Sequence, residues 1–119
     1  MKCSYQNIQD QPICSLPVDS NSRLNFCLLH DPDLQKTEAE LLKLIKFKIS
    51  QNDYNFEGSF FSSSLNLREM VFFEFVNFEN CQFLGGETNF YRAQFKKGVL
   101  FNQSIFKGRK LNFSKANFG

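Results

Sequence analysis

The alternation of small, polar and apolar residues is nearly periodic through residues 55–119. Twelve units follow the order small, polar, apolar, and the middle position is Asn or Gln in eight of them. Self-similarity of this kind dictates architecture more strongly than any local signal does. The repeat therefore predicts the fold of this half of the chain. Its apolar centres are Phe56, Phe61, Leu67, Phe73, Phe78, Phe83, Phe90, Phe95, Phe101, Phe106, Phe113 and Phe118.

Every fourth centre is separated by 22 or 23 residues, although single steps between centres vary from five to seven. The extra residues fall mainly at one corner, within Ser62–Ser64, Leu84–Glu87 and Lys107–Lys110. Four units therefore form one coil with four short sides, and three coils stack at the strand spacing of ~4.8 Å. Aromatic rings that stack in columns bury one another. We expect four columns, which contain Phe56, Phe78 and Phe101; Phe61, Phe83 and Phe106; Leu67, Phe90 and Phe113; and Phe73, Phe95 and Phe118.

The position two residues before each centre is expected to point inward as well, and it is mostly small or β-branched. The position between the two points outward. There Asn66, Asn89 and Asn112 share one side, so that their amides could form a ladder along the stack. Apolar residues also occupy some outward positions, and three Phe near the first coil could form a docking patch, although scattered exposed apolar residues are ordinary. The apolar outward residues are Phe60, Phe72, Leu100 and Ile105, with Phe75 at a corner.

These units resemble the motif of the pentapeptide-repeat proteins, in which a small residue is followed by Asn or Asp, by Leu or Phe, and by two free residues. The resemblance covers just over half of the chain and implies a right-handed, four-sided β-helix. Steps of six and seven residues depart from the strict motif and are similar to the Phe-rich branch of the family, so the corners should bulge. We expect an all-β solenoid of about three coils. The units that carry the resemblance are Thr88-Asn89-Phe90, Ala93-Gln94-Phe95, Leu111-Asn112-Phe113 and Ala116-Asn117-Phe118.

A second pattern precedes the repeats: Cys3, Cys14, Cys27 and His30 follow the spacing C-x10-C-x12-C-x2-H. Three Cys and one His are an accepted tetrahedral set for structural zinc. Disulfides are the rival interpretation, but Cys81 occupies an inward repeat position, and the three remaining Cys are an odd number. Thiols without a ligand are the third interpretation. The segment is also similar to one found in some pentapeptide-repeat proteins, and that resemblance implies the same four ligands.

An amphipathic helix is predicted between the two patterns. Thr37-Glu38-Ala39-Glu40 reads as a capping box, and Leu41, Ile45 and other apolar residues then recur at helical spacing. Such a helix could bind a partner or a membrane, but the first coil of a solenoid needs a cap. We therefore expect three parts: a zinc segment at 1–32, a capping helix at 33–53 and the β-helix at 54–119.

Charge is uneven along the chain. Its net value is −1 over residues 1–53, −4 over 54–91 and +7 over 92–119, where no acidic residue occurs. Such asymmetry is compatible with an anionic partner or with a solvated surface. It argues against the acidic DNA mimicry known in the resembled family. The residues for anion or nucleic-acid contact are Arg92, Lys96, Lys97, Lys107, Arg109, Lys110 and Lys115.

No catalytic constellation emerges, because the one His belongs to the zinc set, and Gly85-Gly86 sits at the long corner without a phosphate-loop motif. We expect a non-enzymatic binding or scaffold protein that presents a rigid surface to a protein partner, and nucleic-acid binding is the alternative. A homodimer through the C-terminal coil is a further expectation. With no signal peptide or membrane span in the sequence, we expect a cytoplasmic protein without membrane contact.

Overall fold

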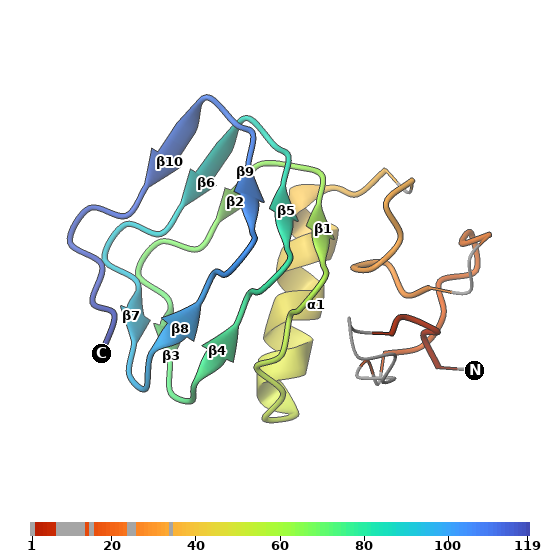
Figure 1. Cartoon of the computed structure of the whole chain (residues 1–119), viewed down its shortest axis with the longest axis horizontal. Helices are drawn as coiled ribbons and strands as arrows, with labels where there is room; N and C mark the ends of the chain where they lie inside the picture. Colours follow the sequence, from red (N-terminus) through yellow and green to blue (C-terminus); the bar gives the residue numbers. More distant parts are fainter. Residues whose placement is uncertain (1, 7–13, 15, 24–25, 34) are drawn as a thin grey trace.

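The computed structural model describes residues 2–6, 14, 16–23, 26–33 and 35–119. Its regular elements are one helix, α1 (Glu38–Ser50), and strands of two or three residues (Figure 1). In chain order the strands are β1 (Phe60–Phe61), β2 (Leu65–Asn66), β3 (Val71–Phe72), β4 (Val76–Asn77), β5 (Gln82–Phe83), β6 (Glu87–Asn89), β7 (Gln94–Phe95), β8 (Val99–Leu100), β9 (Ile105–Phe106) and β10 (Lys110–Asn112).

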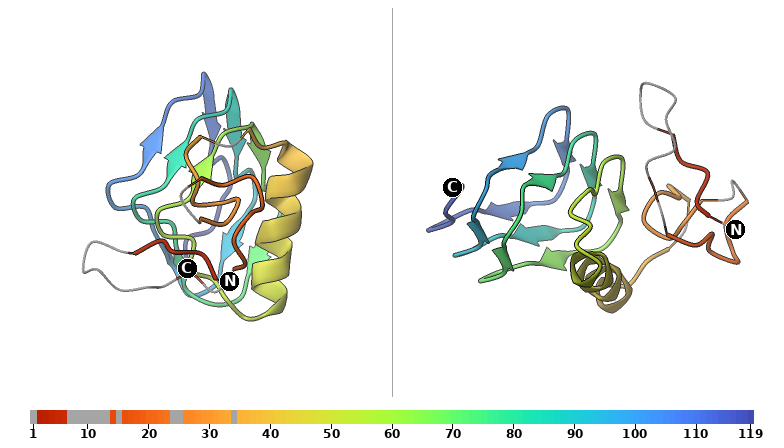
Figure 2. Two further views of the ribbon diagram at one scale, coloured as in Figure 1. Left: turned by 90° about the vertical axis from the view of Figure 1, so that its right-hand side faces the viewer. Right: turned by 90° about the horizontal axis from the view of Figure 1, so that it is seen from below.

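The strands pair in four parallel sheets, with the orders β1-β5-β9, β2-β6-β10, β3-β7 and β4-β8. Each strand pairs with the strand four places further along the chain: Phe61 lies in register with Phe83, and Phe83 with Phe106. The chain therefore visits the four sheets in turn and then returns to the first (Figures 1 and 2). We call residues 54–75, 76–98 and 99–119 the first, second and third coils. The prediction of parallel β-structure with one helix is confirmed.

Aromatic rings fill the interior between the sheets. Three of the four expected columns are confirmed. In the first column, Phe78 stacks between Phe56 and Phe101 at centroid distances of 5.1 and 5.4 Å. The strand registers align the members of the second and third columns in the same way. Neighbouring columns meet edge to face, an arrangement that complements the ring quadrupoles. The stacked pairs of the second and third columns are Phe61–Phe83 at 4.8 Å, Phe83–Phe106 at 4.5 Å and Phe90–Phe113 at 4.9 Å.

The fourth column contains Phe72, and the prediction of Phe73 at this place was wrong. Phe72 is fully buried and stacks on Phe95 at 4.8 Å, whereas 61% of Phe73 is exposed. The expected inward position moves as well, because Met70 packs against the core and Val71 lies only half-buried. The physical reason is the pairing of β3 with β7, which sets Phe72 opposite Phe95. The step from Leu67 to Phe72 is therefore five residues long, and the step of six residues runs from Phe72 to Phe78.

Corners of two kinds alternate around each coil. After the first and third columns the chain makes a tight turn, in which, for example, the Ala93 N–H donates to the Phe90 carbonyl at 3.0 Å. The second residue after the centre has a positive φ, which is 56° at Arg92 and 74° at Gly58. After the second and fourth columns the corners are longer. Gly85 lies at such a corner without a positive φ, and a Cβ there would overlap the Ser63–Ser64 backbone.

The Asn residues of the outward positions stabilise the corners of their own coil. The side-chain oxygens of Asn66, Asn89 and Asn112 each accept from the backbone N–H two residues later, at 3.1, 2.8 and 2.8 Å. This is the local turn that Asn favours. The expected ladder of amides between coils is therefore replaced by bonds within each coil.

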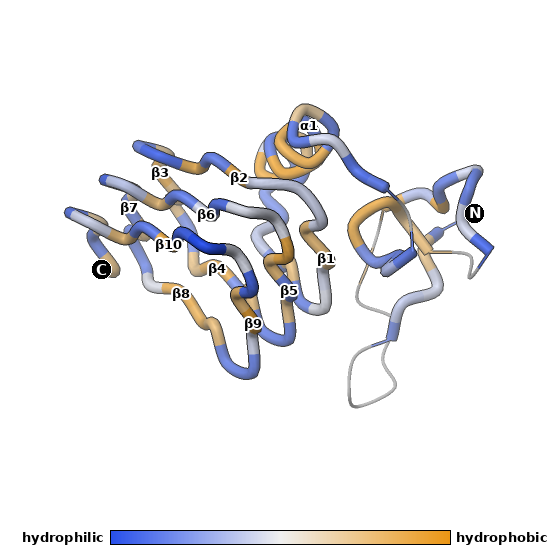
Figure 3. The backbone as a smooth tube through the Cα atoms, turned by 90° about the horizontal axis from the view of Figure 1, so that it is seen from above, coloured by the Kyte–Doolittle hydropathy of each residue, from blue (hydrophilic) through white to orange (hydrophobic). Residues whose placement is uncertain are grey.

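Helix α1 lies along one side of the first coil, next to β2, and the Cys-containing segment covers the end of the stack (Figures 2 and 3). The predicted capping box is present, because the Thr37 side chain accepts from the Glu40 N–H while Glu40 accepts from the Thr37 N–H. Leu41 and Ile45 are fully buried. Among the described residues, no helix combines the length and the apolar character that crossing a membrane requires.

Candidate metal centre

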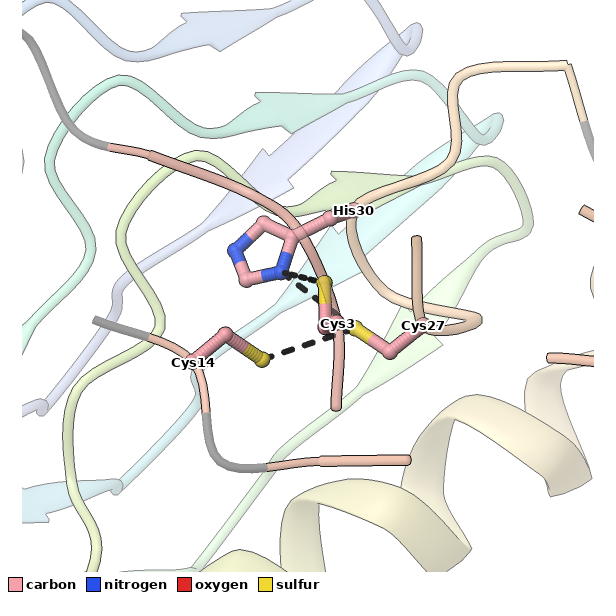
Figure 4. Close-up of side chains that lie close together, drawn as sticks. All are labelled: Cys3, Cys14, Cys27 and His30. Carbon is pink, nitrogen blue, oxygen red and sulfur yellow. Dashed lines mark hydrogen bonds between the residues drawn. The ribbon is translucent and has the colours of Figure 1, made fainter. Parts of the chain in front are cut away.

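The three Cys and the His of the N-terminal segment converge on one point (Figure 4). Cys3 is placed by backbone pairing, in which its N–H donates to the Leu16 carbonyl at 2.8 Å. Cys27 and His30 lie on one turn, closed by the bond from the Asp31 N–H to the Cys27 carbonyl at 3.2 Å. All four side chains are buried, and their ligand atoms lie within 4.8 Å of one another.

Distances within the cluster match a tetrahedral site. Nδ1 of His30 lies 3.4 Å from Sγ of Cys3 and 3.3 Å from Sγ of Cys27, and Sγ of Cys14 lies 3.7 Å from Sγ of Cys27. A tetrahedral zinc ion with bonds of ~2.3 Å to sulfur and ~2.0 Å to nitrogen holds two sulfurs about 3.8 Å apart and a sulfur and a nitrogen about 3.5 Å apart. Three of the six separations among the four atoms are therefore close to those that such an ion imposes.

The disulfide interpretation does not fit this arrangement. The Cys14–Cys27 separation is far longer than the ~2.05 Å of a disulfide bond, and all four Cys are free thiols. Cys81 lies outside the cluster, in the core, and its thiol donates to the Phe56 carbonyl at 3.0 Å. Its role as a small buried side chain in the repeat is therefore confirmed.

His30 connects the cluster to the first coil. Its Nδ1 faces the sulfurs, while Nε2 lies 2.7 Å from the Glu57 carbonyl oxygen. Because a carbonyl can only accept, Nε2 carries the proton and Nδ1 remains available as a ligand. Tyr5 stacks on the imidazole at a centroid distance of 4.0 Å and fixes the ring plane. This is the second shell that orients a metal-binding His.

Electrostatics favour a cation at the centre of the cluster. Hydrogen bonds from Cys14 and Cys27 lower the pKa of Cys3, while hydrogen bonding to Cys14 and Cys3 raises the pKa of Cys27. Burial lowers the pKa of His30, but its bonds to Cys14 and Cys3 outweigh burial and raise the pKa to about 9. A divalent cation bound by these side chains would displace the protons of their hydrogen bonds.

Two further contacts join the Cys-containing segment to the first coil. The Phe60 N–H donates to the Leu29 carbonyl at 2.7 Å. Lys36, almost fully buried, donates to the carbonyls of Leu29 and Phe60 at 3.1 and 2.6 Å. Burial lowers the pKa of Lys36 to about 8. Neither this side chain nor the Glu57 carbonyl could be recognised as part of the site from the sequence pattern.

The basic residues predicted for anion contact do not form one cluster. They occupy three corners of the stack, and Lys97 pairs with Glu74 at 3.0 Å. At the corner after the third column, the guanidinium groups of Arg68 and Arg92 lie 5.4 and 5.3 Å from the centre of the Tyr91 ring. The remaining corners carry Lys96 and Lys97, and Lys107, Arg109 and Lys110.

Comparison with known protein families, with characterised proteins and with solved structures finds no match to this chain.

Proposed function

We propose that Cys3, Cys14, Cys27 and His30 bind one zinc ion with a structural role. The observation that carries this proposal is that four buried ligand atoms lie within 4.8 Å of one another, with three of their separations between 3.3 and 3.7 Å. Three thiolates and an imidazole suit zinc better than a hard cation such as magnesium. Four protein ligands leave no coordination position for water or substrate, so the ion would hold segments together and would not act on a substrate.

Metal analysis of the purified protein tests the zinc site. Protein prepared without added metal should contain about one equivalent of zinc, and Cys27→Ser should lose most of it. Cys81→Ser is the matched control, because this buried Cys lies outside the cluster. Less than half an equivalent in the wild type, or a full equivalent in Cys27→Ser, would refute the site.

We further propose that residues 54–119 form a right-handed, four-sided β-helix of the pentapeptide-repeat kind, which serves as a non-enzymatic scaffold for a protein partner. The parallel registers at intervals of 22 and 23 residues support the architecture. The single His is committed to the metal cluster, which leaves no general base of that type for catalysis. A stack of short strands around packed rings is rigid, and rigidity lowers the entropic cost of binding.

Isolation of partners from the native host, followed by reconstitution with the purified proteins, tests this function. A protein partner should bind in a defined stoichiometry and remain bound in moderate salt. If no protein binds in reconstitution, the scaffold function is wrong.

Nucleic-acid binding is the second candidate, and the Tyr91 ring flanked by Arg68 and Arg92 favours it, because base stacking and phosphate contact use such residues. Binding to single-stranded nucleic acid should weaken steeply as salt increases. Arg92→Glu should reduce it, whereas Lys43→Glu, on the exposed face of α1, should have little effect.

A further inference from the structure

The corner between β3 and β4 carries two strongly exposed aromatic residues. Phe73 and Phe75 have exposed fractions of 61% and 48%, although nearly all other Phe of the first two coils are buried. Displacement of Phe73 from the fourth column by Phe72 leaves it on the surface without a place in the core. Exposed aromatic side chains that lie close together are typical of the centre of a protein-binding surface.

The second coil holds these side chains in place. The corner between β7 and β8 lies beside the corner between β3 and β4 (Figure 1). Registers on both sides set Phe75 opposite Gly98, and a Cβ at Gly98 would make an ordinary van der Waals contact with the Phe75 ring, at 3.6 Å. The Phe75 ring therefore lies against the neighbouring coil. The aromatic surface is therefore part of the rigid stack.

The exposed charge beside the two rings that is not part of an ion pair is positive. The acidic neighbours are both paired: Glu74 with Lys97 at 3.0 Å and Asp53 with Lys48 at 3.3 Å. Lys96, which the register places beside Phe73, is exposed. A carboxylate of a partner next to Lys96 would complement this charge while an apolar side chain covers the rings.

A polar hollow of about 420 Å³ adjoins the aromatic corner. Asn52, Asn55 and Asn77 line it together with Tyr54, Phe75 and the two paired acidic residues, Asp53 and Glu74. Amides in such a hollow can bind the backbone of a peptide, whereas a lipid surface offers no matching donors.

From these observations we infer that the surface formed by Phe73, Phe75, Lys96 and the adjoining hollow binds an acidic peptide segment of a partner protein through an apolar anchor residue. This inference rests on the proposed scaffold function and names the face and the chemistry of its partner. It places the binding site at the one corner where the aromatic repeat turns outward.

Selection from a library of displayed random peptides tests the inference, with the metal-loaded full chain as bait. Selected peptides should carry an apolar residue next to Asp or Glu. Synthetic versions should bind Phe73→Ser and Phe75→Ser about tenfold or more weakly than the wild type. Lys96→Glu should reduce affinity by a smaller factor. Ile105→Ser is the matched control, since 44% of this apolar side chain is exposed on another wall, and its affinity should stay within about twofold.

Five outcomes would overturn the inference. Peptides whose binding ignores Phe73 and Phe75 would place the partner on another face and leave the scaffold function standing. Selection of basic peptides would contradict the charge argument. Binding to vesicles of phosphatidylserine and phosphatidylcholine that Phe73→Ser abolishes would identify a membrane as the occupant, and self-association abolished by the same substitution would identify a second copy. Failure to select any peptide would count against this surface, whereas the scaffold function is judged by the separate reconstitution.

Discussion

The first and third coils repeat the same design, but their environments differ. The inward rings of the first coil, such as Phe56 and Phe61, are fully buried, whereas Phe106 and Phe113 of the third are only half-buried and 47% of Phe118 is exposed. Side chains from the N-terminal half also bind the backbone of the first coil. Lys36, Lys48 and His30 donate to its carbonyl groups, and Glu38 accepts from the Asn66 N–H at 2.8 Å.

This difference shows that two conditions must be met at the end of a stack of parallel strands. The apolar side chains that face the end must be covered, and the backbone donors and acceptors there must be paired. Leu41 and Ile45 of α1 contribute to the cover, since they belong to the same core cluster as the rings. Long polar side chains pair the backbone, because Lys can reach a carbonyl from a distant backbone. In the proposed zinc site, the metal would hold the His30 contact in place.

The largest effect is expected from loss of the metal, which should remove the difference between the two ends. A ligand present at 1,000 times its dissociation constant stabilises a fold by about 4 kcal/mol. Cys27→Ser or a chelator should therefore lower the free energy of unfolding by at least that much. Hydrogen exchange should show faster exchange of the Phe60 N–H, which donates to Leu29. Unchanged stability in a metal-free protein would contradict the coupling; Cys81→Ser should keep its metal.

Truncation of equivalent rings should show the same asymmetry. Phe61→Ala opens a cavity in a closed environment and should cost about 3–5 kcal/mol, while Phe106→Ala, in a half-buried position, should cost about 1–2 kcal/mol. Denaturant titration of both variants measures the difference. Equal costs would mean that the third coil is covered as well as the first. Phe83→Ala, in the middle of the same column, should resemble Phe61→Ala.

Removal of a polar contact at the first coil should have an intermediate effect. Lys48 is buried, donates to the Asn55 carbonyl at 2.5 Å, pairs with Asp53 and lies over the Phe56 ring. Lys48→Met keeps the aliphatic chain but leaves the carbonyl and the carboxylate without this partner, and should cost about 1–3 kcal/mol. Lys46→Met, on the exposed face of α1, is the control and should change thermal unfolding little.

The smallest effect is expected at the corner Asn residues. Asn89→Ala removes the bond to the Tyr91 N–H in the middle coil, and should cost about 0.5–1.5 kcal/mol. Asn112→Ala removes the equivalent bond in the exposed third coil and should cost less, because water can replace it there. If Asn112→Ala proves the more damaging variant, the third coil depends on its corners more than the first two coils do.

The sequence predicted much of the stack, because ring spacing records the register directly. The choice between Phe72 and Phe73 failed, since adjacent Phe residues both fit a step of five or six. The phase could have decided it: the additional residue at 84–87 sets later columns 23 apart, and only Phe72 lies 23 residues before Phe95. The metal residues were predictable from chemistry and count. The buried lysines were not, because their partners are backbone carbonyls that only the folded chain brings near.

The two kinds of corner have a consequence for the length of the chain. At the tight corners, every coil keeps the same five-residue step, whereas the corner after Phe61 has six residues to the next centre and the equivalent corner after Phe83 has seven. The columns on both sides stay in register despite this insertion. Two corners of each coil thus have a constant length, whereas the corner after the second column differs in length between coils. For protein engineering, that corner is the place to insert a loop, an epitope or a reporter, because the added residues would project outward without displacing any ring.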